Sequence, residues 1–185
     1  RINSYTLPLT KQEKRNARWS GEFKTIVYRL ARETLDFWRD NQILTERHIL
    51  RMVEAELISE LMIAMMDGLQ DKKKSIDVFY KDYDSSFPQK TELVHRFQEC
   101  LKMIRDIMND DLRKTQFRKK VLFYSLFCAI YDVLYHLPKM RRATHSIPKS
   151  AYPTIRKSLS ELSDEIGAGL KAMRTRARRP KRQYE

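Results

Sequence analysis

Glycine and proline are scarce in this chain, and their scarcity constrains its fold more than any other feature. The 185 residues include four glycines and six prolines. Sheet-rich folds need frequent glycine- and proline-containing turns between short strands, so this composition favours a few long helices. Hydrophobic residues make up 42% of the sequence, which is enough to build the core of one ordinary domain. We therefore predict an all-α protein.

Apolar residues recur at spacings of three and four, which indicates a bundle of about six to seven helices. Thr10 and Glu13 form the pattern of a capping box, Ser20 is placed to cap a second helix, and Thr45 a third that Gly68 would end. The third helix leaves only a narrow polar stripe and should lie at the centre of the domain. The expected helices cover about 11–19, 21–40, 45–67, 75–83, 90–109, 117–137 and 150–173.

The net charge of +13 favours polyanionic partners such as nucleic acid, phosphates or anionic membranes. Alternatively, the charge only keeps the domain in solution. The basic end of the chain has three possible interpretations. Its positive charges can complement the dipole of a helix, or they can contact DNA phosphates without recognising the base sequence. The third is that this segment is a disordered or vector-derived tail. The predicted nucleic-acid contacts in this tail are Arg174, Arg176, Arg178, Arg179, Lys181 and Arg182.

The most apolar stretch, 117–137, has nearly the length of a membrane span, but Asp132 and His136 interrupt it. We interpret it as a buried core helix and expect no membrane association. Cys100 and Cys128 lie within apolar helical patterns and form no Cys-x-x-Cys motif, which is typical of free cysteines in a reducing compartment. The first fourteen residues lack a secretory signal, so we expect a cytoplasmic protein.

The usual catalytic signatures are absent from the sequence, including the Walker loop, the dinucleotide-binding glycines and the zinc-protease motif. Asp132 and His136 lie one helical turn apart and could share a metal or a proton, although a polar contact inside a core helix explains them too. Glu56 and Glu60 have the same spacing, but two carboxylates fall short of a metal site and salt bridges explain them better. We predict no catalytic residue and no metal ligand in this chain.

A cluster of amides, guanidiniums and one carboxylate at the front of the chain is the most specific feature. These groups straddle a turn into a helix, where amides and guanidiniums suit phosphate, a carboxylate suits Mg²⁺, and the helix N-terminus attracts anions. Ordinary capping chemistry is the alternative, and it explains Glu13 in particular. The candidate residues are Arg1, Asn3, Gln12, Glu13, Arg15 and Asn16.

The same segment resembles a known family. The run Arg1-Ile2-Asn3-Ser4, then Leu7-Pro8-Leu9-Thr10, then Gln12-Glu13-x-Arg15-Asn16-Ala17 is similar to the signature R-I-N-(S/T)…P-L-(N/T)-x-Q-E-x-R-N-A of GmrS-like domains. Supporting features are a Glu-rich apolar helix that ends at Gly68 and the run Phe79-Tyr80-x-x-Tyr83-Asp84. The resemblance covers roughly residues 1–140.

GmrS-like domains form the N-terminal part of GmrSD-type modification-dependent restriction endonucleases, which act in phage defence. The resemblance implies a ParB-related α/β part that binds or hydrolyses a nucleoside triphosphate with Mg²⁺, followed by a helical bundle that controls an HNH nuclease. On this reading 1–19 ends the nucleotide-handling part, 20–173 is the bundle and 174–185 is a basic tail. The six candidate residues at the front would border the nucleotide pocket.

The chain departs from the family pattern in one respect. The Asp-Gly-Gln-Gln-Arg-type segment that precedes the signature in the family is absent, as is any HNH pattern. We therefore expect the chain to be the helical half of a larger α/β-plus-helical domain, inactive by itself, with DNA and an HNH nuclease domain or subunit as partners and oligomers allowed. The alternative is a non-catalytic, basic helical module that binds DNA or serves as a scaffold.

Overall fold

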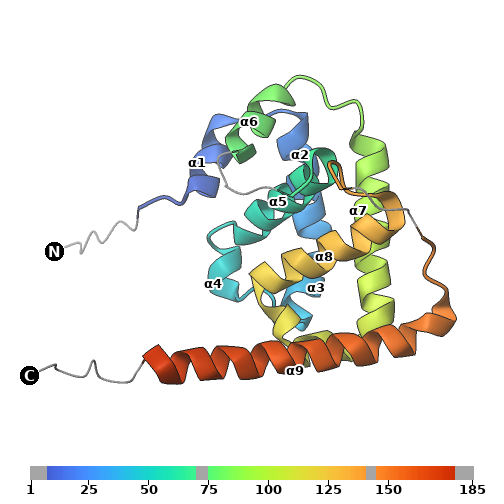
Figure 1. Cartoon of the computed structure of the whole chain (residues 1–185). Coiled ribbons are helices and arrows are strands. Elements are labelled where there is room, and N and C mark those ends of the chain that lie inside the picture. The colour runs from blue at the N-terminus through green and yellow to red at the C-terminus, as the bar shows by residue number, and fades with distance from the viewer. Residues whose placement is uncertain (1–7, 70–74, 141–144, 178–185) are drawn as a thin grey trace, which may run out of the picture.

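The chain folds into helices throughout the part that the structure describes. The computed structural model describes residues 8–69, 75–140 and 145–177. Within these ranges there are nine α-helices, seven of them at least seven residues long, and no β-strand, so the predicted all-α bundle is confirmed. The α-helices are α1 (Lys11–Arg18), α2 (Glu22–Glu33), α3 (Leu35–Asp40), α4 (Glu46–Ile49), α5 (Val53–Asp67), α6 (Ser75–Asp82), α7 (Lys90–Met108), α8 (Lys120–Tyr135) and α9 (Tyr152–Ala177). Figure 1 shows α1 and α6 at one end of the bundle and α9 along the opposite edge.

The predicted capping box opens α1. The Thr10 hydroxyl accepts a hydrogen bond from the backbone N–H of Glu13 at 3.1 Å, and the Glu13 carboxylate accepts one from the backbone N–H of Thr10 at 2.6 Å. Each bond satisfies an N–H group that a helix start leaves without an intrahelical partner. The box therefore fixes the direction in which the chain enters α1.

The start of α2 differs from the prediction that Ser20 caps it. Gly21 is the N-cap residue and makes no side-chain cap bond. The backbone N–H of Glu22 instead donates to the carbonyl oxygen of Asp84, just after α6, at 2.9 Å. A Cβ atom at Gly21 would lie 2.0 Å from that same oxygen. The backbones approach too closely here for any side chain, and a glycine meets this need.

The predicted helix over 45–67 is two helices. Thr45 caps α4 as expected, since its hydroxyl accepts from the backbone N–H of His48. The chain then breaks, and Met52 adopts left-handed backbone angles (φ 57°) before α5 begins. Within the break, the Arg51 guanidinium donates to the carbonyl oxygen of Pro8 at 2.6 Å. Gly68 ends α5 with φ 83°, as the sequence predicted.

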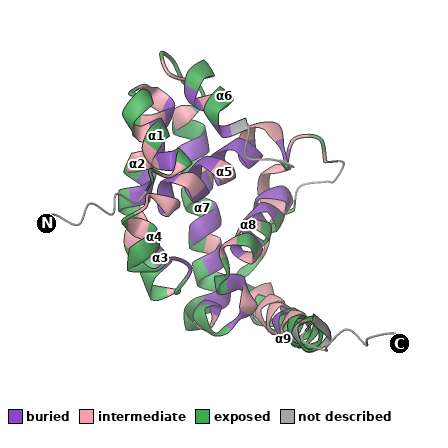
Figure 2. Ribbon diagram, turned by 90° about the vertical axis from the view of Figure 1, so that its left-hand side faces the viewer, coloured by how far each residue is buried: buried purple, intermediate pink, exposed green. Residues whose placement is uncertain are grey.

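Helix α5 is the centre of the bundle, as its apolar surface predicted. Ten of its fifteen residues are buried, and it contacts α1, α2, α4, α6, α7 and α8. Figure 2 shows the buried residues concentrated along α5, α7 and α8. Edge-to-face contacts among Phe37, Trp38 and Phe123 tie α3 to α8 in the same core. Because α1, α6 and α8 all meet α5, residues on its surface can link all three.

The apolar stretch near the middle of the chain is the buried helix α8. Within the described ranges, none of the helices has the length and hydrophobicity needed to span a membrane. Asp132 is buried, and its carboxylate accepts from the backbone N–H of Leu137 at 2.9 Å, so it caps the end of α8. His136 Nδ1 lies 3.8 Å from the same carboxylate. Cys100 and Cys128 are free and buried, and burial raises the pKa of each thiol to about 12.

The last helix, α9, crosses the edge of the bundle against α7 and the 3₁₀ turn η2 (Gln116–Arg118), which follows the 3₁₀ turn η1 (Asn109–Lys114) in the chain. A third such turn, η3 (Lys149–Ala151), leads into α9. The Ser163 hydroxyl accepts from the backbone N–H of Gln116 at 2.9 Å, and the Arg156 guanidinium donates to the carbonyl oxygen of Ile107. These contacts fasten the first half of α9 to α7 and η2.

Candidate functional site

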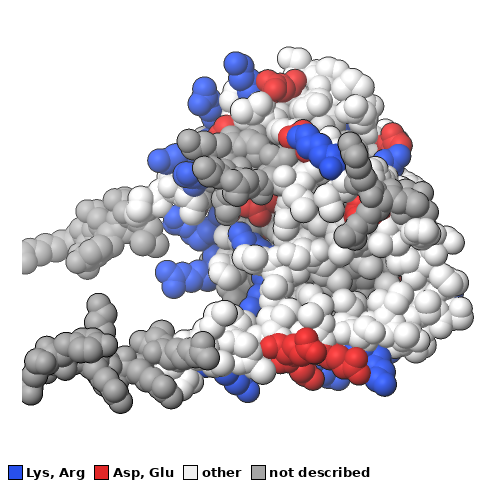
Figure 3. All heavy atoms as spheres, in the orientation of Figure 1, with Lys and Arg blue, Asp and Glu red and all other residues white. Residues whose placement is uncertain are grey.

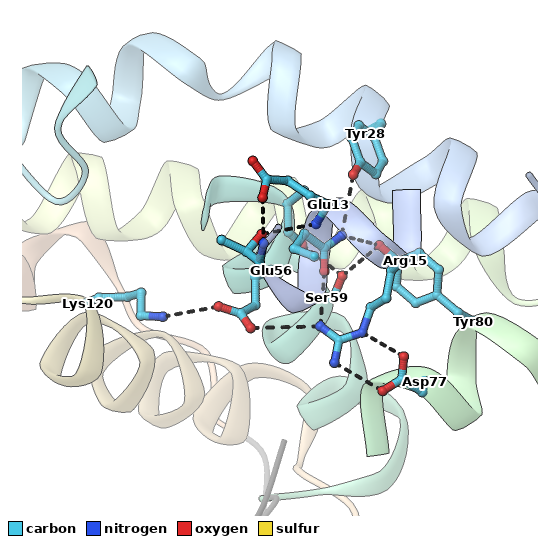
Figure 4. Close-up of polar contacts among 11 residues, drawn as sticks. Glu13, Arg15, Tyr28, Glu56, Ser59, Asp77, Tyr80 and Lys120 are labelled. Carbon is cyan, nitrogen blue, oxygen red and sulfur yellow. Dashed lines mark hydrogen bonds and ion pairs between the residues drawn. The ribbon is translucent and has the colours of Figure 1, made fainter. Parts of the chain in front are cut away.

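Four of the six candidate residues at the front of the chain lie on α1, against α5 and α6. Arg1 and Asn3 lie outside the described residues. Figure 4 shows how the side chains of α1 meet those of neighbouring helices in one polar network. We call this network the α1 lock; its members are Gln12, Arg15, Glu56, Ser59, Asp77 and Tyr80.

Gln12 lies inside the protein, with 2% of its surface exposed. Its amide nitrogen donates to the Tyr80 hydroxyl at 2.8 Å and lies 3.5 Å from the Tyr28 hydroxyl. Its amide oxygen accepts from Arg15 at 3.3 Å. Tyr80 is also buried, and its hydroxyl lies 3.2 Å from that of Ser59 on α5. Both ends of the amide are therefore engaged within the bundle, as buried polar groups require.

Arg15 is the charged centre of the α1 lock. Only 3% of its side chain is exposed. Its guanidinium donates two hydrogen bonds to the Asp77 carboxylate on α6, from Nε at 2.9 Å and from Nη2 at 3.2 Å. Such paired bonds to a carboxylate fix the plane of the guanidinium. Arg15 therefore joins α1 to α6 in a defined orientation.

Glu56 extends the α1 lock from α5 to α8. One carboxylate oxygen of Glu56 lies 3.8 Å from Nη1 of Arg15, and the other lies 3.8 Å from Nζ of Lys120 at the start of α8. The Glu56 side chain is 17% exposed and that of Lys120 is 28% exposed, so water screens these ion pairs only in part. Through Glu56, a movement of α1 would alter the electrostatic environment of the first turn of α8.

Glu13 stands at the open end of α1. It closes the capping box and also lies 3.3 Å from the Arg51 guanidinium, which in turn holds the Pro8 carbonyl. The backbone N–H of Thr10 and the Arg51 charge lower the pKa of the Glu13 carboxyl. Asn16 is half-buried, and its backbone carbonyl accepts from Nζ of Lys24 at 2.8 Å. Both residues thus hold the two ends of α1 in place.

The arrangement is suited to positioning the helices relative to one another. In the described ranges, no group of three or more His, Cys, Asp or Glu side chains is placed to hold a metal ion. Gln12 and Arg15 use their hydrogen-bonding groups on the protein itself. Whether Arg1 and Asn3 line a phosphate pocket stays a prediction.

Sequence reasoning did not find the partners of Gln12 and Arg15. Glu56, Asp77 and Tyr80 lie 44 to 68 positions beyond Gln12, and no local pattern connects them with it. One signal was present: Tyr80 belongs to the aromatic-acidic run that supports the family resemblance. Its burial raises the pKa of its hydroxyl further above neutral pH.

Basic side chains gather on the surface of the described residues as well. The backbone of α9 includes Arg174 and Arg176, while Arg178, Arg179, Lys181 and Arg182 lie outside the described residues. Figure 3 shows Lys and Arg side chains gathered along the edge that carries α1 and α4. We call this surface the basic edge; its exposed members are Lys11, Lys14, Arg18 and Arg47.

An open groove of about 620 Å³ lies between α2 and the α4–α5 corner. Glu54 lines it while only 8% exposed, and one of its carboxylate oxygens has no hydrogen-bond partner among the described residues. This burial raises the pKa of Glu54, and burial also raises the pKa of the neighbouring Tyr28 to about 12. The lining thus combines apolar side chains with Arg29, Arg32 and the buried carboxyl of Glu54.

Comparison with known proteins gives no match to this chain: no family model, no curated protein and no solved structure is significantly similar to it.

Proposed function

We propose that this chain is the helical part of a GmrS-like phage-defence protein. In this proposal a ParB-like α/β half binds and hydrolyses a nucleoside triphosphate with Mg²⁺, and the nucleotide state regulates DNA cleavage by an HNH nuclease domain or subunit. The similarity of residues 1–17 to the GmrS signature carries the proposal. The α1 lock supports it, because the helix that bears the second half of the signature is fastened to α5 and α6 by Arg15, and to α2 by the hydrogen bond from Lys24 to the Asn16 carbonyl.

The geometry divides the signature residues into two roles. Gln12 and Arg15 are positioning residues, since both are buried and bonded within the bundle. Glu13 fixes the first turn of α1. In the proposal, Arg1 and Asn3 are left to contact the triphosphate, through a guanidinium and an amide, both of which suit phosphate oxygens.

The α1 lock also offers a route from nucleotide to DNA. Ligand contacts before α1 would shift this helix, which itself carries Lys11, Lys14 and Arg18 of the basic edge. The ion pairs from Arg15 to Glu56 and from Glu56 to Lys120 would set how far the helix moves. Regulation of this kind requires that the nucleotide bind two states of the protein with unequal affinity. We propose that the basic edge contacts the DNA backbone in one of these states, together with the basic tail.

Isothermal titration calorimetry of the full-length protein with each of the four ribonucleoside triphosphates and Mg²⁺ tests the nucleotide half of the proposal. We expect Asn3→Ala to abolish binding without changing the unfolding temperature. Gln98→Ala, which shortens an exposed amide on α7, is the matched control and should bind normally. If the wild-type protein binds none of the four, the nucleotide proposal is wrong.

A second function, a DNA-binding or scaffolding module without nucleotide control, is favoured by the basic edge alone. It predicts DNA affinity that falls steeply with salt and ignores nucleotide. Replacing Lys11, Lys14 and Arg18 by alanine should reduce the slope of log K against log salt by about 0.9 for each lost phosphate contact. Fluorescence anisotropy with labelled duplexes at several salt concentrations, with and without triphosphate, separates the two functions.

A further inference from the structure

The carboxyl group of Glu54 is buried at a cost that the fold does not offset. Glu54 lies in the first turn of α5, and its Oε2 has no hydrogen-bond partner among the described residues. The carboxyl accepts a hydrogen bond from its own backbone N–H, and no described Lys or Arg forms an ion pair with it. The Tyr28 hydroxyl donates to Met52 Sδ at 3.3 Å instead. Buried carboxylates ordinarily pair with a cation or accept several hydrogen bonds, so this one is suited to a cationic donor from outside the chain.

The groove that Glu54 lines has an apolar surface beside this carboxyl. The groove has a volume of about 620 Å³, which is enough for a small organic molecule. Ala31 is buried along it, and Tyr28, Leu35 and Ile49 are half-buried. A molecule that reaches Glu54 would therefore lay an apolar body on these side chains and lose water from it, which favours binding.

Two arginines of α2 bring the opposite charge to the same groove. Arg29 and Arg32 are exposed and line it together with Glu54. Arg29 lies 3.6 Å from the Glu33 carboxylate, whereas the Arg32 side chain makes no hydrogen bond or ion pair with a described residue. A guanidinium binds a carboxylate through two parallel hydrogen bonds. The groove thus offers a site for an anionic group as well as one for a cation.

We propose that this groove binds a free α-amino acid with an apolar side chain. The ammonium group of the ligand donates to the Glu54 carboxylate and offsets its buried charge. The carboxylate of the ligand accepts from the Arg32 guanidinium, and its side chain packs on Leu35 and Ile49. Each of the three kinds of group in the groove then has a complementary group on the ligand.

Ligands with only one of these charges fit the groove less well. A simple amine would satisfy Glu54 but would bring a second positive charge to the arginines, and like charges close together repel. A simple carboxylic acid would satisfy Arg32 and leave Glu54 buried without a partner. A nucleobase offers N–H donors to Glu54 but no positive charge to offset that of the carboxylate. The amino acid avoids all three defects.

Three molecules with the same aromatic body test the ligand class. L-Phenylalanine carries both charges, phenethylamine only the ammonium group, and 3-phenylpropanoate only the carboxylate. Titrations followed by amide NMR shifts measure the affinity and show whether the ligand lies on α2 and α5. We expect L-phenylalanine to bind with a dissociation constant of about 1 mM or tighter, and the other two about tenfold more weakly. If L-leucine, L-phenylalanine and L-tryptophan at about 10 mM all leave the α2 and α5 signals unmoved, or if 3-phenylpropanoate binds as tightly as L-phenylalanine, the proposal is overturned.

Two substitutions assign the charges of the ligand to their partners. Glu54→Gln keeps the size of the side chain, and we expect it to weaken L-phenylalanine about tenfold and to leave 3-phenylpropanoate unchanged. Arg32→Gln should weaken both of these ligands, by about threefold because Arg32 is exposed, and leave phenethylamine unchanged. Glu165→Gln makes the same chemical change as Glu54→Gln on an exposed residue of α9 and should alter none of the affinities.

Circular dichroism shows that each variant keeps its helix content before it is titrated. An affinity for L-phenylalanine that is the same in the wild type and in a folded Glu54→Gln variant would overturn the assignment of this site.

Discussion

Replacing Arg15 by methionine removes the charged centre of the α1 lock and keeps most of its apolar volume. The substitution leaves the Gln12 amide oxygen without its donor in a buried position, which costs about 1–3 kcal/mol. It also removes the paired hydrogen bonds to Asp77, whose side chain is 58% exposed, so water replaces much of that interaction and the loss is about 1 kcal/mol. We expect a total loss of about 3 kcal/mol of unfolding free energy.

Changing the partner of Arg15, Asp77, should lower the free energy of unfolding much less. Asp77→Asn keeps one acceptor for Arg15 and lies at an exposed position, so we expect a loss of about 1 kcal/mol or less. Urea unfolding followed by circular dichroism measures both values. The Arg15→Met change should also lower the melting temperature by about 6–12 °C in a chain of this length. Equal costs for the two variants, or an Arg15→Met loss below about 0.5 kcal/mol, would refute the assigned burial of Arg15.

Three further predictions concern stability. In the folded protein the pKa of Glu54 is raised above its value in the unfolded chain. The contribution of Glu54 to the free energy of unfolding is therefore present at low pH and is lost as the pH rises through the folded pKa. Glu54→Gln should accordingly raise the melting temperature at pH 7 and have little effect near pH 4. Gly21→Ala should cost about 2–3 kcal/mol in urea unfolding, because its Cβ would press on the Asp84 carbonyl, and unchanged stability would contradict that close approach. Gln42→Gly relieves a left-handed conformation (φ 55°) and should add about 0.5–1 kcal/mol, less the exposed contact with Arg118; a loss of stability would show that this contact matters more than the backbone.

Local patterns predicted the helices well where a signal lies within a few residues. The capping box at Thr10 and the stop at Gly68 were predicted because the interacting groups are three residues apart or belong to one residue. The break before α5 was not predicted. Met52 adopts a left-handed backbone conformation there, and the sequence around it contains no glycine or proline that would indicate a turn. Ser20 was expected to cap α2, and it does not, because the carbonyl oxygens after α6 satisfy that helix end instead.

In the candidate site, too, the sequence predicts what depends on neighbouring residues and fails for contacts between residues far apart in the chain. The chemical character of Gln12, Glu13 and Arg15 was visible in the sequence, and so was the capping role of Glu13. Their orientation was not, because it depends on partners such as Asp77 and Tyr80 on another helix. From sequence alone, a polar cluster at the start of a helix fits a ligand site and an internal hydrogen-bond network equally well. The packing of that helix decides between them.

Nucleotide control of DNA binding is tested most directly by the DNA affinity of the protein. It is measured by fluorescence anisotropy with and without triphosphate and Mg²⁺, in the wild type and in Glu56→Gln. Coupling through the α1 lock predicts that nucleotide changes the wild-type dissociation constant by about fivefold or more and that Glu56→Gln removes most of this change while leaving nucleotide binding intact. A wild-type protein that binds nucleotide and binds DNA with the same dissociation constant in both conditions would contradict this coupling.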